Sequence, residues 1–155
     1  MLTARRIGLA ACLALLVALP VSAETDRAGP EKAMALVARA VTYLKAHGKD
    51  GAAKAFNDPK GQFVEGELYI FVLGTDGRYV AYGADPMLVG ADVRDLKDAE
   101  GTPIVQQMID RTASKPDAMV EYVWLNRPEN KVEHKRSYVI REGDWIIGAG
   151  YYTAD

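Results

Sequence analysis

A change in hydrophobic period part-way along the chain restricts the possible folds more than any other feature of the sequence. Met34, Val37, Val41 and Leu44 recur at intervals of three and four, which predicts an amphipathic helix over residues 30–46. From residue 68 onward, short β-branched and aromatic runs are separated by turn-forming sequences such as Asp76-Gly77. Tight turns join antiparallel strands, so the sequence predicts an α+β fold with an antiparallel sheet and excludes an all-parallel one.

The same pattern gives the expected order of elements. We expect five strands, over residues 68–73, 79–82, 118–125, 133–141 and 145–152. A short helix is expected over residues 50–56 and another over residues 103–114, with Ile104, Met108 and Ile109 facing inward. The long N-terminal helix should cover one face of the sheet. Residues 83–114 should partly cover the other face and leave a cavity between that segment and the sheet.

The N-terminus has the three-part layout of a secretory signal peptide. Arg5 and Arg6 precede an uncharged run over residues 7–19, and the small residue Ala23 stands just before the acidic Glu24. The apolar stretch is at the lower limit of the roughly 20 residues that a membrane span needs, so we expect cleavage after Ala23 and not an uncleaved anchor. The mature protein would be periplasmic and free of transmembrane segments, with a flexible lead at residues 24–29 and one domain at residues 30–155.

Charge and cysteine content narrow the classes of partner. The chain has 19 basic and 21 acidic residues, and removal of Arg5 and Arg6 would leave a net charge of 17 − 21 = −4. An acidic domain of this kind does not suit nucleic acid, because phosphate binding needs a concentrated basic surface. Cys12 is the only cysteine and lies inside the apolar run, and His47 and His134 do not have metal-ligand spacing. We therefore expect no disulfide, no metal and no cofactor.

Catalytic motifs are also missing from the sequence. Ser137 lacks the flanking glycines of a nucleophile elbow. Gly148 and Gly150 flank Ala149 but do not form a dinucleotide fingerprint, which needs six positions that open a helix after a strand. We therefore expect a binding protein and not an enzyme.

Residues on two neighbouring strands are candidates for a binding site. Lys135 and Ser137 share one strand face by the period-two rule, and Tyr122 and Trp124 share one face of the strand before it. If both faces look into the cavity, an ammonium, a hydroxyl and two aromatic walls converge in a way that suits a small carboxylate. The pattern is equally compatible with a solvated Lys135 and with a Trp124 that only fills the core.

Three further aromatic residues are placed near the same cavity. Tyr69 and Phe71 share one face of the first strand, where they belong either to the pocket floor or, more commonly for such residues, to the core. Tyr82 ends the second strand and either offers its hydroxyl to a ligand or packs half-buried with its hydroxyl in water. The sequence leaves both alternatives open.

Five segments of the chain carry a family resemblance through their order and spacing. They are residues 85–92, 96–101, 120–124, 135–139 and 145–152. Together they resemble the single Cache domain, a PAS-like extracytoplasmic sensor module of bacterial chemoreceptors and histidine kinases that also occurs as free-standing exported proteins. The resemblance implies a PAS-like five-stranded antiparallel sheet with a helix and loop segment over a ligand pocket. It also implies that small organic acids are bound, and it puts Tyr82 at the position of a pocket histidine in many relatives.

Two hypotheses about function follow. In the first, the chain is a free-standing periplasmic sensor domain that binds a carboxylate metabolite without catalysis, through Tyr82, Tyr122, Trp124, Lys135 and Ser137. Its occupancy would be signalled to a membrane-bound sensor or through a homodimer. In the alternative, the domain is a ligand-free interaction or dimerisation module, with a cavity filled by its own side chains and the apolar stripe of the N-terminal helix as the dimer surface.

Overall fold

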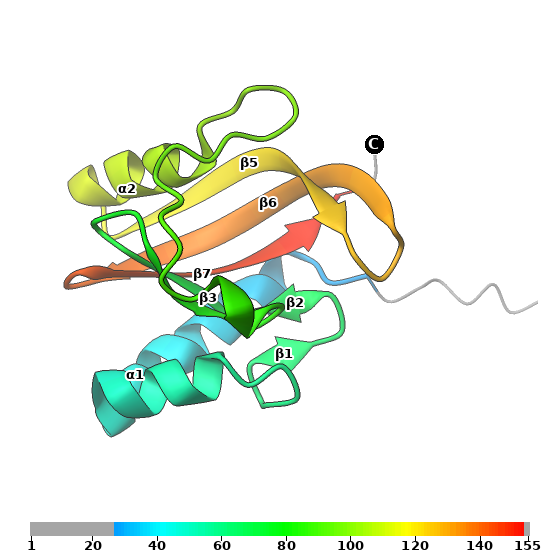
Figure 1. Cartoon of the computed structure of the whole chain (residues 1–155). Coiled ribbons are helices and arrows are strands. Elements are labelled where there is room, and N and C mark those ends of the chain that lie inside the picture. Colours follow the sequence, from blue (N-terminus) through cyan, green and yellow to red (C-terminus); the bar gives the residue numbers. More distant parts are fainter. Residues whose placement is uncertain (1–26, 154–155) are drawn as a thin grey trace, which may run out of the picture.

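The computed structural model describes residues 27–153, so the expected signal peptide at residues 1–23 lies outside the described residues. Its centre is an antiparallel sheet of five strands in the order β4-β3-β7-β6-β5 (Figure 1), which confirms the predicted fold class. The strands are β3 (Phe71–Gly74), β4 (Tyr79–Tyr82), β5 (Asp117–Asn126), β6 (Lys131–Glu142) and β7 (Trp145–Tyr152). Among the residues described, no helix is both long and apolar enough to span a membrane.

Helix α1 (Pro30–Phe56) packs along one face of the sheet, below it in Figure 1. Its backbone is interrupted at Gly48, where φ is 70° and ψ is 177°, so the two expected helical segments are separated by a kink. The buried side chains that face the sheet are Ala33, Leu36, Val37, Ala40 and Val41. The prediction that Met34 belongs to this stripe was wrong: its side chain is 43% exposed, because the buried stripe is centred on Val37 and Ala40.

The expected continuous strand over residues 68–73 is broken at Ile70. Its first part, β2 (Leu68–Tyr69), pairs with the short strand β1 (Val64–Glu65) and not with the main sheet. The Ile70 N–H donates to the carbonyl oxygen of Phe63 at 3.0 Å, after which Phe71 begins β3. The alternation of faces survives the break, since Ile70 packs in the α1-side core and Phe71 in the core on the opposite side.

The hairpin of β3 and β4 contains a β-bulge. Val72 pairs with Ala81 and Leu73 pairs with Tyr79, which leaves Val80 as an extra residue in β4. Because of that extra residue, Tyr79 and Tyr82 both join the core on the face of the sheet opposite α1. Simple alternation would have put them on opposite faces.

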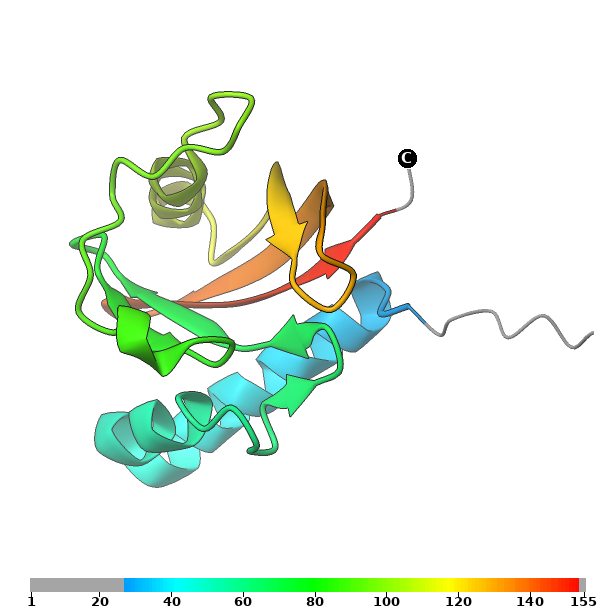
Figure 2. The same ribbon diagram turned by 45° about the vertical axis from the view of Figure 1, so that its right-hand side comes forward.

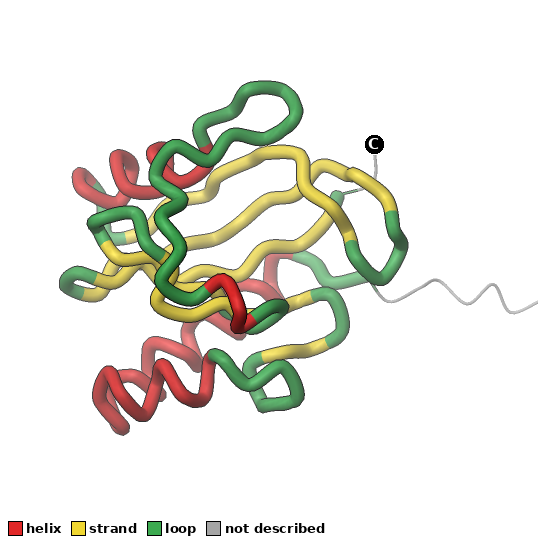
Figure 3. Tube along the Cα trace, viewed as in Figure 1, coloured by secondary structure: helices red, strands yellow, loops and turns green. Residues whose placement is uncertain are grey.

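The second face of the sheet is covered by the chain between β4 and β5. It consists of the short 3-10 helix η1 (Pro86–Leu88), a long loop and helix α2 (Ile104–Ser114), and Figures 2 and 3 show it on the side opposite α1. As predicted, the side chains of Ile104 and Met108 on α2 are buried, and that of Ile109 is partly buried. Asp98 ties the loop to the edge strand by accepting a hydrogen bond from the Val123 N–H at 2.9 Å.

Candidate functional site

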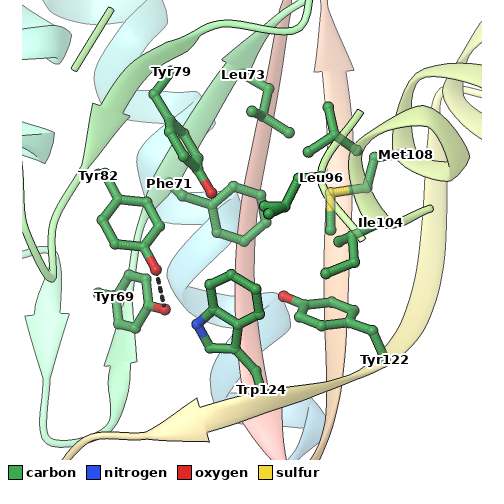
Figure 4. A pocket seen from close by; sticks show the side chains of 11 residues that line it. Tyr69, Phe71, Leu73, Tyr79, Tyr82, Leu96, Ile104, Met108, Tyr122 and Trp124 are labelled. Carbon is green, nitrogen blue, oxygen red and sulfur yellow. Dashed lines mark hydrogen bonds between the residues drawn. The ribbon is translucent and has the colours of Figure 1, made fainter. Parts of the chain in front are cut away.

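A small cavity lies between the sheet and the covering segment with α2. Its volume is about 20 Å³, which is room for about one water molecule. Figure 4 shows the side chains that line it, which are Tyr69, Phe71, Leu73, Tyr79, Tyr82, Leu96, Ile104, Val105, Met108, Tyr122 and Trp124. We call this space the inner cavity. Five of the seven residues chosen from the sequence line it: Tyr69, Phe71, Tyr82, Tyr122 and Trp124.

Tyrosine hydroxyls supply most of the polar atoms of the inner cavity. The hydroxyl oxygens of Tyr69 and Tyr82 lie 3.0 Å apart (Figure 4), and their ring centroids are 5.2 Å apart. Burial raises the pKa of Tyr69 well above its ordinary value, and burial likewise raises the pKa values of Tyr79 and Tyr122. These three phenols therefore keep their protons at neutral pH and remain hydrogen-bond donors.

Lys135 does not line the inner cavity but contacts the tyrosines beside it, and it is only 1% exposed. Its Nζ atom donates to the hydroxyl of Tyr69 at 3.1 Å and to the hydroxyl of Tyr152 at 3.4 Å. The same atom is 4.5 Å from the ring centroids of both tyrosines. Gly150 makes this position possible, because a Cβ atom there would lie 2.6 Å from Lys135 Cε.

The charge of Lys135 has no anionic partner at hydrogen-bond distance. Within residues 27–153 its hydrogen-bond partners are neutral phenols and no carboxylate forms an ion pair with it. Burial lowers the pKa of Lys135 to about 7, and the negative charge of Glu67 acts in the opposite direction. An ammonium in such surroundings is costly unless it is paired with an anion. Within the described residues, a protonated Lys135 is therefore left without a compensating anion at hydrogen-bond distance.

Ser137 also lies outside the lining of the inner cavity and contacts one of its tyrosines. Its side chain is fully buried, and its Oγ atom is 2.8 Å from the hydroxyl of Tyr122. In the sheet Ser137 stands between Val120 on β5 and Gly150 on β7, and Lys135 stands between Tyr122 and Tyr152. The expected common face of these strands is therefore present. Lys135 and Ser137 reach the inner cavity through the tyrosines that they contact, while the tyrosines themselves form its surface.

A second, larger cavity adjoins the first. Its volume is about 190 Å³, and we call it the outer cavity. Tyr69 and Trp124 line both cavities, so their side chains form the wall between them. The other residues that line the outer cavity are Pro59, Val64, Gly66, Glu67, Gly83, Ala84, Leu125, Arg127, Pro128 and Tyr152. It thus has an apolar interior with an acidic and a basic group.

Sequence reasoning missed two tyrosines of the site. Tyr79 was not selected because the bulge at Val80, which has no clear signature in the sequence, turns its side chain toward the cavity. Tyr152 was not selected because every residue of β7 is buried, so the strand shows no alternation that would indicate a face. Its hydroxyl also donates to the carbonyl oxygen of Leu125 at 2.8 Å.

No group of three or more histidine, cysteine, aspartate or glutamate side chains within residues 27–153 is arranged to hold a metal ion.

Comparison with known proteins then decides the family. The family model described as Single Cache domain 2 matches residues 31–155. The chain belongs to this family. Cache sensory domains are non-catalytic ligand-binding modules, which agrees with the buried cavity described above.

Solved structures of Cache domains are similar to this chain. A methyl-accepting chemotaxis protein from Vibrio parahaemolyticus has 24% sequence identity and a TM-score of 0.68, with coverage of 79% of this chain and 86% of that one. A Cache chemosensory domain described in terms of carboxylic acid recognition has 26% identity and a TM-score of 0.67, with coverage of 80% and 92%. A periplasmic sensor domain of a chemotaxis protein has 21% identity and a TM-score of 0.63, with coverage of 80% and 90%.

Proposed function

We propose that this protein is a periplasmic sensor domain that binds a small carboxylic acid and performs no catalysis. The observation that carries the proposal is the buried Lys135, whose hydrogen-bond partners are tyrosine hydroxyls and not a carboxylate. Charge-assisted hydrogen bonds to a carboxylate are about twice as strong as neutral ones. A bound acid would therefore compensate the cost of burying the ammonium.

The surrounding side chains support a small monocarboxylate. The hydroxyls of Tyr69 and Tyr82 lie 3.0 Å apart and can donate to carboxylate oxygens, with Lys135 behind Tyr69. Tyr122 and Trp124 form apolar walls for the carbon chain, and Ser137 fixes the orientation of the Tyr122 hydroxyl. The similar Cache domain described in terms of carboxylic acid recognition supports the same class of ligand.

A thermal-shift screen tests this proposal. Residues 24–155, which contain all of the described domain, would be heated with sodium salts of small organic acids, with amino acids and with purines. A ligand that binds only the folded state must raise the melting temperature. We expect a rise with one or more small acids in the wild type and none in Lys135→Met. A rise that persists in Lys135→Met would contradict the role of the ammonium.

One observation favours the alternative function. The inner cavity has a volume of only about 20 Å³, so its own side chains nearly fill it. A ligand-free interaction module would have such a cavity, and a well-folded protein that responds to no compound in the screen would support it. Size-exclusion chromatography with light scattering at several concentrations would then show whether a homodimer is the functional form.

We also infer export with cleavage after Ala23. The basic pair, apolar run and small residue at the N-terminus support this inference. Mass spectrometry of the exported protein should find Glu24 at the N-terminus, whereas Met1 would indicate an uncleaved anchor. The occupancy signal would pass from the domain to a membrane-bound sensor.

A further inference from the structure

The wall between the two cavities is made of two side chains that are held in different ways. Tyr69 is fixed at its hydroxyl by hydrogen bonds with Tyr82 and Lys135, at 3.0 Å and 3.1 Å. The indole N–H of Trp124 makes no hydrogen bond with another residue of the described chain. Trp124 is half-buried at the margin of the apolar cluster on this face, and its ring makes an edge contact with Tyr122, at 5.9 Å between ring centroids. Trp124 is thus the less constrained half of the wall.

The two sides of this wall differ in size and chemistry. The inner cavity, with the tyrosine hydroxyls, accommodates about one water molecule. The outer cavity is far larger, and Val64, Ala84, Leu125 and Pro128 give it apolar surface. An acid held by its carboxylate at the tyrosines, with its carbon chain directed toward this apolar space, must pass Trp124, which lines both cavities.

We propose that Trp124 sets the upper chain length of the acid that the site accepts, and that the outer cavity is a subsite for the acid's carbon chain. The inference rests on the proposed function and deepens it. With Trp124 in place, the shortest acids bind best. Without its ring, the two cavities join and longer straight-chain acids gain contacts.

Charges near the outer cavity specify monocarboxylates. Glu67 lines this cavity, and its charge acts on Lys135. Arg127 is the basic group of the lining, and Asp85 already pairs with it at 3.5 Å. Arg127 therefore already has an acidic partner, and Glu67 adds a negative charge to the lining of this cavity. A second carboxylate at the far end of the ligand would meet repulsion from Glu67, so dicarboxylates should bind more weakly than monocarboxylates of equal length.

A chain-length series tests the inference directly. Sodium acetate, propionate, butyrate, pentanoate, hexanoate and succinate would be titrated by calorimetry into wild-type protein and into Trp124→Ala and Trp124→Leu. The leucine variant retains apolar contact with Tyr122, so it gives a measurement if the alanine variant does not fold. Val132→Ala is the matched control, because Val132 lies on the same β5–β6 hairpin, is 58% exposed and lines neither cavity.

We expect wild type and Val132→Ala to prefer the same short acids and to lose affinity from butyrate onward. In the Trp124 variants each added methylene should instead increase affinity, by about fourfold where it becomes fully buried. Succinate should bind more weakly than butyrate in every protein. A wild type that binds acids, combined with Trp124 variants of unchanged length preference, overturns the inference and leaves the proposed function intact. Binding of no acid by any of the proteins overturns both.

Discussion

The Nζ atom of Lys135 lies 3.1 Å from the hydroxyl oxygen of Tyr69 and 4.5 Å from the centroid of its ring. The pair joins a buried ammonium to a phenol that lines both cavities. Because the amine is buried among neutral groups, its pKa is lowered to about 7, and its charge depends on pH near neutrality.

The first prediction concerns stability and pH. Burial lowers the pKa of Lys135 to about 7, whereas an unfolded lysine titrates near 10.4. Between these values the unfolded chain binds more protons, so this group makes stability rise with pH, by at most about 1.4 kcal/mol per pH unit. Lys135→Met has no titrating group at this position, so it should be more stable than wild type near pH 7. Urea unfolding of both proteins from pH 7 to pH 9.5 should show the variant's advantage shrinking as pH rises. An advantage that is constant with pH would contradict a neutralised Lys135.

The second prediction concerns ligand binding and pH. Below pH 7 Lys135 is already charged, so the affinity for an acid such as propionate should be nearly constant there. Above pH 7 binding must first protonate the amine, so affinity should fall, by at most about tenfold per pH unit. The facing phenols of Tyr69 and Tyr152 have raised pKa values from burial and stay neutral, and Glu67 is the carboxylate whose charge acts on Lys135.

Calorimetry at pH 8 in phosphate and in Tris checks the second prediction. Uptake of a proton by Lys135 makes the observed heat depend on the ionisation enthalpy of the buffer. Equal heats in the two buffers would show that the ammonium takes up no proton on binding.

The third prediction uses the close approach of Lys135 to β7. In Gly150→Ala the added Cβ would lie 2.3 Å from Ser137 Oγ and 2.6 Å from Lys135 Cε. We expect a loss of about 1–3 kcal/mol in unfolding free energy from overpacking, together with weaker acid binding. Gly29→Ala is the matched control, since its added Cβ has no neighbour within 4 Å. Equal urea midpoints for the two variants would contradict the packing of Lys135 against Gly150.

The fourth prediction concerns the N-terminal segment ahead of α1. Arg27 donates to both carboxylate oxygens of Glu133, at 2.9 Å and 2.8 Å, and Glu133 is only 6% exposed. Arg27→Ala should lower stability by about 1–3 kcal/mol, because a buried carboxylate loses the cation that donates to both of its oxygens and keeps only the more distant Lys131, at 3.5 Å. Arg136→Ala, which breaks an exposed pair with Glu121, should lower stability far less than Arg27→Ala does, because solvent screens a pair whose two side chains are both exposed.

The pH dependence of the Arg27→Ala effect has a definite sign. Hydrogen bonds from Arg27 are the main cause that lowers the pKa of Glu133. The stabilisation is therefore fully present above the unfolded glutamate pKa of about 4.3 and is lost as pH falls through the lower folded value. Denaturation at pH 7 and pH 3 should show the difference between wild type and Arg27→Ala shrink at the lower pH. A difference that is equally large at pH 3 would contradict a charged pair.

Much of the fold could be predicted because the sequence patterns are local. The period of three and four in α1 and the turn signals at Asp76-Gly77 give the α+β class and the strand order along the chain. The period-two rule also groups Tyr122 and Trp124 on one face of β5, and in the structure both line the inner cavity. The break at Ile70 could not be predicted, because it depends on a hydrogen bond with Phe63, which the residue pattern does not encode.

The site was predicted less completely, for two physical reasons. The bulge at Val80 breaks the alternation that would otherwise assign Tyr79 to a face. Cavity dimensions depend on rotamers and on packing between distant segments, so the sequence could not show that Lys135 lies behind Tyr69 and Tyr152. For the same reason it could not show that Trp124 separates two spaces.

The most direct test of the central claim is a crystal structure of residues 24–155 grown with the acid that raises the melting temperature most. We predict a carboxylate within hydrogen-bond distance of Lys135 Nζ or of the Tyr69 and Tyr82 hydroxyls, with the carbon chain directed toward Trp124. An acid bound elsewhere on the protein, with the Lys135–Tyr69 and Tyr69–Tyr82 contacts unchanged, would contradict the account.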